Sequence, residues 1–231
     1  MSRVSPSEPF VLIHVGKCAG GTACHELHKA GHIFEHIHVQ KPTIKNESRY
    51  AILIRDPVSR FASAFHWRKF ILQKQTASSE ESDSLQTMKN RMELEFLSHF
   101  KDVNELAEML NPDNPTHGLH GGISLVQLIG HVTLGFSWYL DDLMEAIQPN
   151  QILAAIAVES LAEDMENVFG IAISTQDKMN YPGKAKPLSP KASGSLRRLF
   201  SNEYRTLQRL SDTLREGGGY QPKALLNYHK Q

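Results

Sequence analysis

Cysteine is scarce in this sequence, and so are long apolar runs and any excess of one charge. Only two cysteines, Cys18 and Cys24, occur among the 231 residues. They lie close together in one short region, so they build no disulfide framework and match no zinc-ligand spacing. A chain with so little cysteine fits a reducing compartment best.

The charge balance and the hydropathy exclude two further classes of protein. Lys and Arg together number 25, as do Asp and Glu, so the formal net charge is zero. A broad nucleic-acid surface needs an excess of basic residues, so we expect no nucleic-acid partner, although a local basic pocket for a small anion stays compatible with this balance. The chain has no apolar stretch of about 18 residues, so we expect no membrane span. Residues 1–9 are polar and the apolar run after them is short, which disfavours a signal peptide and favours a cytoplasmic protein.

Apolar runs followed by helical patterns determine the expected fold class. The runs that predict buried strands are residues 10–15, 51–54 and 151–158. The helices expected to follow them cover residues 20–29, from Pro57 to about Gln75, and 159–169. Strands joined to helices by short connections indicate an α/β fold with a central parallel sheet flanked by helices. The length suits one such core, so we expect a single domain over residues 1–231.

The remaining segments are assigned from periodicity and composition. Residues 33–39 alternate in polarity, which predicts a short extended segment with His36 and His38 on one side and Glu35 on the other. Helical character is expected over residues 85–110 and 191–215, and loops over 111–122 and 174–190. The sequence contains no internal repeat.

The loop after the first predicted strand has the composition of a phosphate cradle. Its residues are Lys17, Cys18, Ala19, Gly20, Gly21 and Thr22. Small residues let backbone N–H groups converge on an anion, and the start of the helix adds partial positive charge. The loop is not a P-loop, in which the lysine follows the glycine and precedes the Ser or Thr that binds Mg²⁺. Cys18 follows Lys17 here, which disfavours ATP–Mg²⁺; a glycine-rich turn with a solvated lysine is the competing interpretation.

The segment after the second predicted strand supplies a second group suited to phosphate. Arg55 ends that strand, where ligands bind in open α/β sheets, and Ser63 lies about two helical turns into the next helix. A guanidinium group and a hydroxyl together suit a terminal phosphate. Arg60 either supports this site or forms a structural ion pair with Asp56.

The two segments together resemble a known enzyme family. The motif K-C-A-G-G-T at residues 17–22 resembles the 5′-phosphosulfate loop of sulfotransferases that use 3′-phosphoadenosine 5′-phosphosulfate (PAPS). The motif R-D-P-x-x-R-x-x-S at residues 55–63 resembles their 3′-phosphate segment. The nearest resemblance is to carbohydrate sulfotransferases of the heparan-sulfate 2-O type and their bacterial relatives. Gly21 and Ala23 depart from the family pattern, and Ala23 leaves Thr22 to carry the hydroxyl contact alone.

The resemblance implies a fold, a reaction and a donor site. The fold would be the P-loop-NTPase-like sulfotransferase fold, with residues 76–150 as a helical insertion on the acceptor side. The reaction would move the sulfuryl group of PAPS to a hydroxyl acceptor, such as a saccharide, leaving 3′,5′-ADP and requiring no metal. Lys17 would stabilise the leaving group, and residues 17–22, Arg55 and Ser63 would hold the donor. A late loop closes the nucleotide site in relatives, which makes Lys186 and Ser189 candidates, although a solvated loop fits equally well.

The acceptor hydroxyl needs a base, and histidine has a pKa near the working pH. The glycosaminoglycan 2-O relatives carry H-x-H before the R-D-P segment, so His38 is the first candidate, His36 the second and Glu35 a reserve. Two alternatives are histidines without a role and a metal site. The histidines that such a metal site would draw on are His25, His28, His32, His36 and His38. No Cys, Asp or Glu completes a regular zinc spacing with them.

Several alternatives stay open at the level of sequence. The reaction could be an ATP- or GTP-dependent phosphotransfer, or the acceptor could be a tyrosine or a small molecule. A non-catalytic nucleotide-binding module is a third alternative. His131, Trp138 and Tyr139 could contact a sugar or belong to the core. Cys18 has no evident His or Asn partner that would make it a nucleophile, and the sequence carries no signal for the oligomeric state.

Overall fold

The computed structural model describes residues 3–78, 84–111, 119–120, 123–173 and 187–228. These residues form two compact units. The first contains the described residues of Met1–Asp56, Leu134–Asn180 and Asn202–Gln231, and the second those of Pro57–Thr133 and Tyr181–Ser201.

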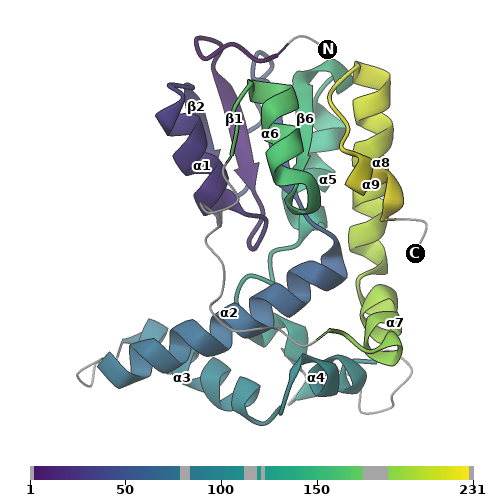
Figure 1. Cartoon of the computed structure of the whole chain (residues 1–231). Coiled ribbons are helices and arrows are strands. Elements are labelled where there is room, and N and C mark those ends of the chain that lie inside the picture. Colours follow the sequence, from purple (N-terminus) through teal and green to yellow (C-terminus); the bar gives the residue numbers. More distant parts are fainter. Residues whose placement is uncertain (1–2, 79–83, 112–118, 121–122, 174–186, 229–231) are drawn as a thin grey trace. The chain divides into compact units, whose positions relative to one another are not determined.

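A four-stranded sheet forms the centre of the first unit (Figure 1). Its strands, in spatial order, are β2 (Phe34–Ile37), β1 (Phe10–His14), β3 (Tyr50–Ile54) and β6 (Ile152–Ala157). All neighbouring pairs are parallel. Every residue of β3 and β6 is buried, as expected for strands covered on both faces. The chain moves from β1 to β2 on one side and then to β3 on the other, so the direction of winding reverses between β1 and β3.

Helices cover this sheet on both faces. They are α1 (Gly20–Lys29), α5 (Phe136–Ala146), α6 (Leu161–Phe169), α8 (Ser201–Gly217) and α9 (Lys223–Asn227). Figure 1 shows α6 in front of the strands and α5 behind them. Their apolar residues join one core with the strands, including Leu27 of α1, Leu140 of α5, Met165 of α6 and Leu210 of α8. Short 3₁₀ turns, η2 (Pro149–Gln151) and η3 (Val158–Ser160), flank β6.

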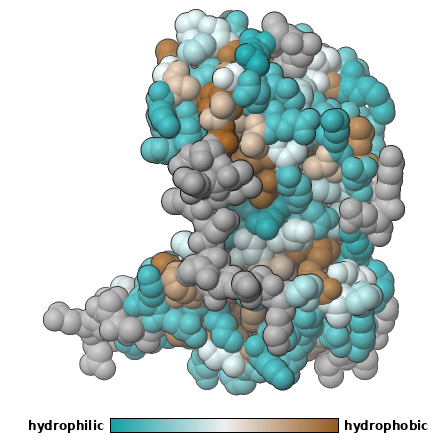
Figure 2. Space-filling model, in the orientation of Figure 1, coloured by the Kyte–Doolittle hydropathy of each residue, from teal (hydrophilic) through white to brown (hydrophobic). Residues whose placement is uncertain are grey.

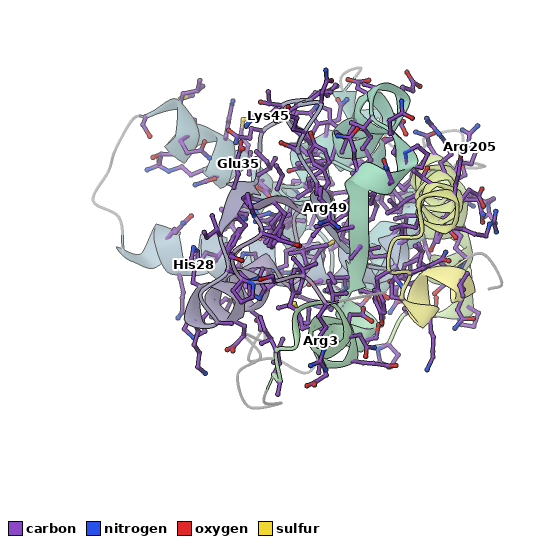
Figure 3. The ribbon with its side chains drawn as sticks, turned by 90° about the horizontal axis from the view of Figure 1, so that it is seen from above. Arg3, His28, Glu35, Lys45, Arg49 and Arg205 are labelled. Atoms are coloured by element: carbon purple, nitrogen blue, oxygen red, sulfur yellow. The ribbon has the colours of Figure 1, made fainter. Side chains whose placement is uncertain are left out.

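The two edges of the sheet differ. The outer edge of β6 is closed by the chain after α8: the Tyr220 N–H donates to the Leu153 carbonyl at 2.8 Å, and the Ala155 N–H donates to the Tyr220 carbonyl at 3.0 Å. No strand among the described residues pairs with the outer edge of β2. That strand carries Glu35, which lies beside Lys45 in Figure 3 and pairs with it at 2.8 Å. Charges on an edge strand oppose pairing with another chain.

The second unit is mainly helical. It contains α2 (Pro57–Ser78), α3 (Leu85–Ser98), α4 (Val103–Met109), α7 (Pro190–Leu199), the turn η1 (Leu125–Leu128) and a hairpin of β4 (Leu119–His120) and β5 (Ile123–Ser124). A buried ion pair joins α2 to α3, where Arg68 Nε donates to Glu93 Oε1 at 2.8 Å. The same oxygen accepts from the Gly130 N–H at 2.8 Å, so Glu93 also fixes the segment after η1.

The prediction of an α/β fold with a central parallel sheet flanked by helices is confirmed. Two boundaries differ from the sequence-based expectation. The helical unit begins at Pro57, before residue 76, and α5 belongs to the first unit. The helix expected over residues 191–215 is two helices, α7 and α8, which meet at Phe200. Phe200 is buried against the ring of Phe61, with ring centroids 5.7 Å apart. The helix is interrupted at this tertiary contact, although the sequence has no proline there.

The surface is largely hydrophilic where it can be seen. Figure 2 shows hydrophilic residues over most of the visible face of the first unit, with a narrow apolar strip in the region of β1 and α6. Among the helices that the structure describes, none has the length and apolar character needed to cross a membrane.

Candidate functional site

The carboxyl ends of β1 and β3 bring two predicted site residues together. Lys17 follows β1 and Arg55 follows β3, and these strands are neighbours. The Arg55 Nη1 donates a hydrogen bond to the Lys17 carbonyl at 3.2 Å. The winding of the sheet reverses between these two strands, which is where open α/β sheets bind ligands. The first unit therefore forms this part of the predicted site by itself.

The β1–α1 loop has an unusual backbone. Lys17 and Ala19 have φ angles of 69° and 58°, in the left-handed region that residues with a Cβ rarely adopt. Cys18 between them is buried, and its Sγ donates to the Gly16 carbonyl at 3.9 Å. Such backbone strain persists only where the surrounding structure enforces it, and it is concentrated at binding and catalytic sites.

The start of α1 carries positive charge without local compensation. Its N-cap residue is Ala19, no side chain of the described residues caps it, and its first turn contains no acidic residue. The first N–H groups of a helix have no partner within the helix and carry a partial positive charge. Gly20 and Thr22 in this turn are buried, whereas Gly21 is exposed. An anion at this helix start would accept hydrogen bonds from N–H groups that have no described side chain as a partner.

The side chains of Lys17 and Arg55 add positive charge beside the start of α1. Burial, and then the nearby Arg55 charge, lower the pKa of Lys17 to about 8, although the nearby Cys18 acts in the opposite direction. The Nε of Arg55 is buried and has no hydrogen-bond partner among the described residues. Two neighbouring cations that are partly withdrawn from water are unfavourable in the absence of an anion. A strongly shifted pKa with a specific charged neighbour is typical of a functional site.

Two carboxylates near the carboxyl ends of the strands accept hydrogen bonds from tyrosine hydroxyls. Asp56 accepts from the Tyr204 hydroxyl at 2.7 Å, and its own N–H donates to Glu159 at 3.0 Å. Glu159 accepts from the Tyr228 hydroxyl at 2.6 Å, and burial followed by the Glu159 charge raises the pKa of Tyr228. These acids therefore take part in a hydrogen-bond network with the two tyrosines. Sequence reasoning missed both tyrosines, which lie in α8 and just after α9.

Three histidines form a cluster at the ends of β1 and β2. The Nδ1 of His38 lies 2.9 Å from the His14 carbonyl, and the His14 and His38 rings stack with centroids 4.1 Å apart. The His14 Nδ1 lies 3.2 Å from the His36 Nε2. The rings of His36 and His38 are parallel with centroids 6.1 Å apart, so these two residues lie on one side of the chain as expected. His14 was not among the residues singled out from the sequence.

The other histidines and Glu35 are placed elsewhere. Glu35 pairs with Lys45 on the exposed edge of β2 (Figure 3). His32 is buried between the rings of Phe10 and Phe169, and burial lowers its pKa. The part of the chain that the structure describes contains no group of three or more His, Cys, Asp or Glu residues arranged to hold a metal ion.

The chain just after His38 is fixed by the aromatic stretch of α5. The Val39 N–H donates to the Tyr139 hydroxyl at 3.0 Å. Lys41 pairs with Asp142 and lies over the Trp138 ring, 5.8 Å from its centroid. Tyr139 is buried in the core, and Trp138 packs against the core partly buried. These residues thus hold the loop that carries His38.

Three predicted site residues belong to the second unit. Ser63 lies half-buried in α2. Arg60 is 2% exposed and donates to the carbonyls of His131 and Val132, so it has a structural role within this unit. Ser189 caps α7, because its Oγ accepts from the Ala192 N–H at 3.0 Å.

Lys186 lies outside the described residues. The candidate site that the structure brings together is therefore the part in the first unit. It consists of residues 17–22, Arg55, His36 and His38, with His14 added by the structure.

No protein-family model, no curated protein and no solved structure matches this chain. The resemblance to sulfotransferases therefore stays a prediction that depends on the two motifs and on the geometry described above.

Proposed function

We propose that this chain is a PAPS-dependent sulfotransferase with the P-loop-NTPase-like fold of that family, acting on a hydroxyl acceptor such as a saccharide. One observation supports this proposal above all. Lys17 and Arg55 meet where the winding of the sheet reverses, beside the uncapped start of α1. The order of these groups along the chain is the order of the two sulfotransferase motifs.

The residues fit a donor with several negative charges. The buried Nε of Arg55 has no described partner, and the start of α1 offers N–H groups to an anion. Arginine binds phosphate oxygens through two parallel hydrogen bonds, which suits a terminal 3′-phosphate. When bound, PAPS supplies an activated sulfuryl group with 3′,5′-ADP as the leaving group. Ser63 and Ser189 stay predicted contacts of the donor.

His38 is the base in this proposal, and Lys17 stabilises the leaving group. A carbonyl only accepts hydrogen bonds, so the contact with the His14 carbonyl places a proton on His38 Nδ1 and leaves the lone pair of the neutral ring on Nε2. His38 Nε2 then accepts the proton of the acceptor hydroxyl as that oxygen bonds to sulfur. Lys17 donates to the phosphate oxygen that is released when its bond to sulfur breaks, and stabilises the charge that develops there. His36 has its Nε2 turned to His14, so it is the weaker candidate for the base.

The loop also disfavours the ATP–Mg²⁺ alternative. In a P-loop, the residue after the lysine offers a hydroxyl to Mg²⁺. Here that residue is Cys18, which is buried with its Sγ near the Gly16 carbonyl.

Nucleotide binding tests the donor site. We expect 3′,5′-ADP to raise the melting temperature and ATP–Mg²⁺ to leave it unchanged, because the site suits a 3′-phosphate. Arg55→Ala should lower the affinity for 3′,5′-ADP about 10- to 100-fold and change the affinity for 5′-AMP little, since a hydrogen bond to a charged group contributes about 1.5–3 kcal/mol. Arg49→Ala is the matched control, because Arg49 precedes the same strand and pairs with Glu8. Stabilisation by ATP–Mg²⁺ instead of 3′,5′-ADP would overturn the proposal.

Transfer of label tests the reaction. Sulfur-labelled PAPS is incubated with the protein and with saccharide, tyrosine-peptide and phenol acceptors. Label on a saccharide supports the full proposal, and label on another acceptor class corrects the acceptor. Binding of 3′,5′-ADP without transfer to any acceptor would show a nucleotide-binding module instead.

A further inference from the structure

His14 makes three separate contacts within the histidine cluster. Its ring stacks on His38, its backbone carbonyl accepts from His38 Nδ1, and its own Nδ1 meets the Nε2 of His36. It lies at the end of β1, beside the start of α1, and its ring is only partly buried. One residue therefore touches both candidate bases.

Gly20 leaves the space that the His14 ring occupies. A Cβ built on Gly20 would lie 2.0 Å from His14 Cε1 and 2.1 Å from its Nδ1, far inside any real contact. Gly20 is helical and does not have a positive φ, so its backbone does not require glycine. A side chain at this position would displace the imidazole of His14, which lies against Gly20.

The backbone beyond His38 is held as well. Val39 has a φ of 60°, which is a strained conformation for a β-branched residue, and its side chain is 62% exposed. No burial of its own explains this strain. The Val39 N–H donates to the Tyr139 hydroxyl, and this hydrogen bond holds the chain directly after His38.

The contact between His14 and His36 holds a single proton. Both atoms are ring nitrogens, so one must donate and the other must accept. Burial, and then the neighbouring His38 and His28, lower the pKa of His36, which favours its neutral ring.

We infer that His14 is the positioning residue of the cluster: it orients His38 with its lone pair on Nε2, shares one proton with His36, and depends on the absence of a side chain at Gly20. The catalytic consequence rests on the proposed function. The tautomers and the dependence on Gly20 do not, so they can be tested without any substrate.

The first experiment is nitrogen NMR of the histidine-labelled protein. We expect His38 as a single Nδ1–H tautomer, and a coupling across the hydrogen bond between His14 Nδ1 and His36 Nε2. In His14→Ala the coupling is lost, whereas His38 keeps the Nδ1–H tautomer, because the backbone carbonyl that accepts from it remains. An Nε2–H tautomer of His38 in the wild type, or the absence of the coupling there, would overturn the inference.

The second experiment is a double-mutant cycle between Gly20 and His14. Gly20→Ala should lower the melting temperature of the wild-type chain, because the new methyl group displaces the His14 ring. In the His14→Ala background the same substitution should raise it, because alanine favours the helix and the space is empty. A change of sign between the two backgrounds shows that the two residues interact, whereas independent effects would give the same melting-temperature change in both. Equal melting-temperature changes in both backgrounds would contradict the role of Gly20.

Kinetics then test the catalytic consequence. His14→Ala should lower kcat about 10- to 100-fold with little change in the KM for PAPS, because a misplaced catalytic group costs up to about 100-fold in rate. His14→Asn keeps a hydrogen-bonding atom near the Nδ1 position and should recover part of the rate. His25→Ala is the control, because His25 is a solvent-exposed histidine of α1. Failure of transfer in the wild type would overturn the proposed function alone, since the NMR and stability results do not depend on it.

Discussion

Two strand–turn–helix connections of the first unit differ sharply in how their charges are balanced. After β1, the chain enters α1 through Lys17 and Ala19 in left-handed conformations, and no described side chain caps the helix. After β6, the chain enters α6 through η3 without any positive φ; α6 also has no side-chain cap, but its first turn contains Glu163 and Asp164. Both connections follow the carboxyl ends of strands in one parallel sheet.

The β6–α6 connection satisfies its own polar groups. Asp164 in the first turn of α6 is 1% exposed. It accepts from the Ala157 N–H at 2.7 Å, the Ser160 hydroxyl at 2.9 Å and the Tyr220 hydroxyl at 2.9 Å. The β1–α1 connection has no such acid, and it places Lys17 beside Arg55 instead. A helix start with acidic residues in its first turn, one of them bound by the connection before it, serves the fold, whereas a helix start without an acid and beside two cations is suited to an external anion.

The largest expected effect comes from removing the lysine of the β1–α1 connection. Lys17→Ala should lower kcat for sulfuryl transfer about 100- to 1000-fold, because a preorganised donor to the developing charge is lost. The fold should be retained. Turnover is measured with sulfur-labelled PAPS, and far-UV circular dichroism checks the fold.

The control for this variant is Lys223→Ala, because Lys223 lies in α9 and pairs with Glu163 on the surface. Near-normal turnover of Lys17→Ala would show that the role assigned to Lys17 is wrong.

The next effect is on stability and concerns the β6–α6 connection. Asp164→Ala should lower the free energy of unfolding by about 2–4 kcal/mol, because one buried and two partly buried donors lose their acceptor. Affinity for 3′,5′-ADP, measured by calorimetry below the melting range, should change less than about threefold, since Asp164 serves the fold and not the ligand.

Glu163→Ala is the matched control in the adjacent exposed position, and urea titration should place it within about 0.5 kcal/mol of the wild type. If Asp164→Ala weakened binding as much as Arg55→Ala, the distinction between the two connections would fail.

A smaller effect is a transfer of protons on binding. With the pKa of Lys17 at about 8, roughly three quarters of this lysine is neutral at pH 8.5 in the free protein, against about a tenth at pH 7. An anion beside Lys17 raises its pKa, so binding of 3′,5′-ADP should take up about half a proton or more at pH 8.5 and little at pH 7. The affinity should accordingly fall as the pH rises through 8.

Calorimetry in two buffers with different protonation enthalpies measures this uptake, and Lys17→Ala should abolish it. Release of protons on binding at pH 8.5 would contradict the assignment.

The smallest effect concerns the backbone strain of the β1–α1 loop. Ala19→Gly should raise the free energy of unfolding by about 0.5–1 kcal/mol, because glycine adopts a φ of 58° without a steric penalty. Ala30→Gly at the other end of α1, where φ is −84°, is the control and should not stabilise the protein. Equal effects of the two substitutions in denaturant titrations would mean that Ala19 is not strained.

The sequence predicted those parts of the structure that depend on local patterns. Strands buried on both faces appear as continuous apolar runs, so β1, β3 and β6 were recognisable. The proline after Asp56 marked the start of α2. The period of two along a strand placed His36 and His38 on one side.

Contacts that depend on register or on distant segments could not be predicted. The parallel register pairs Ile13 with Ile37, and this places His14 beside His38, 24 residues away. Asp56 meets Tyr204 across 148 residues, and no sequence pattern links the two. The break at Phe200 has neither proline nor glycine to mark it, because its cause is the burial of one ring.

The closure of β6 by Tyr220 has a consequence for the chain as it is synthesised. β1, β2 and β3 are synthesised close together, but β6 follows about one hundred residues after β3, and Tyr220, which pairs with its outer edge, follows more than sixty residues after β6. Pairing between such distant segments is slow, and an unpaired strand edge invites association with other chains. The nascent protein must therefore carry an unfinished sheet until the segment around Tyr220 has been synthesised, and it depends on that segment to end the exposure.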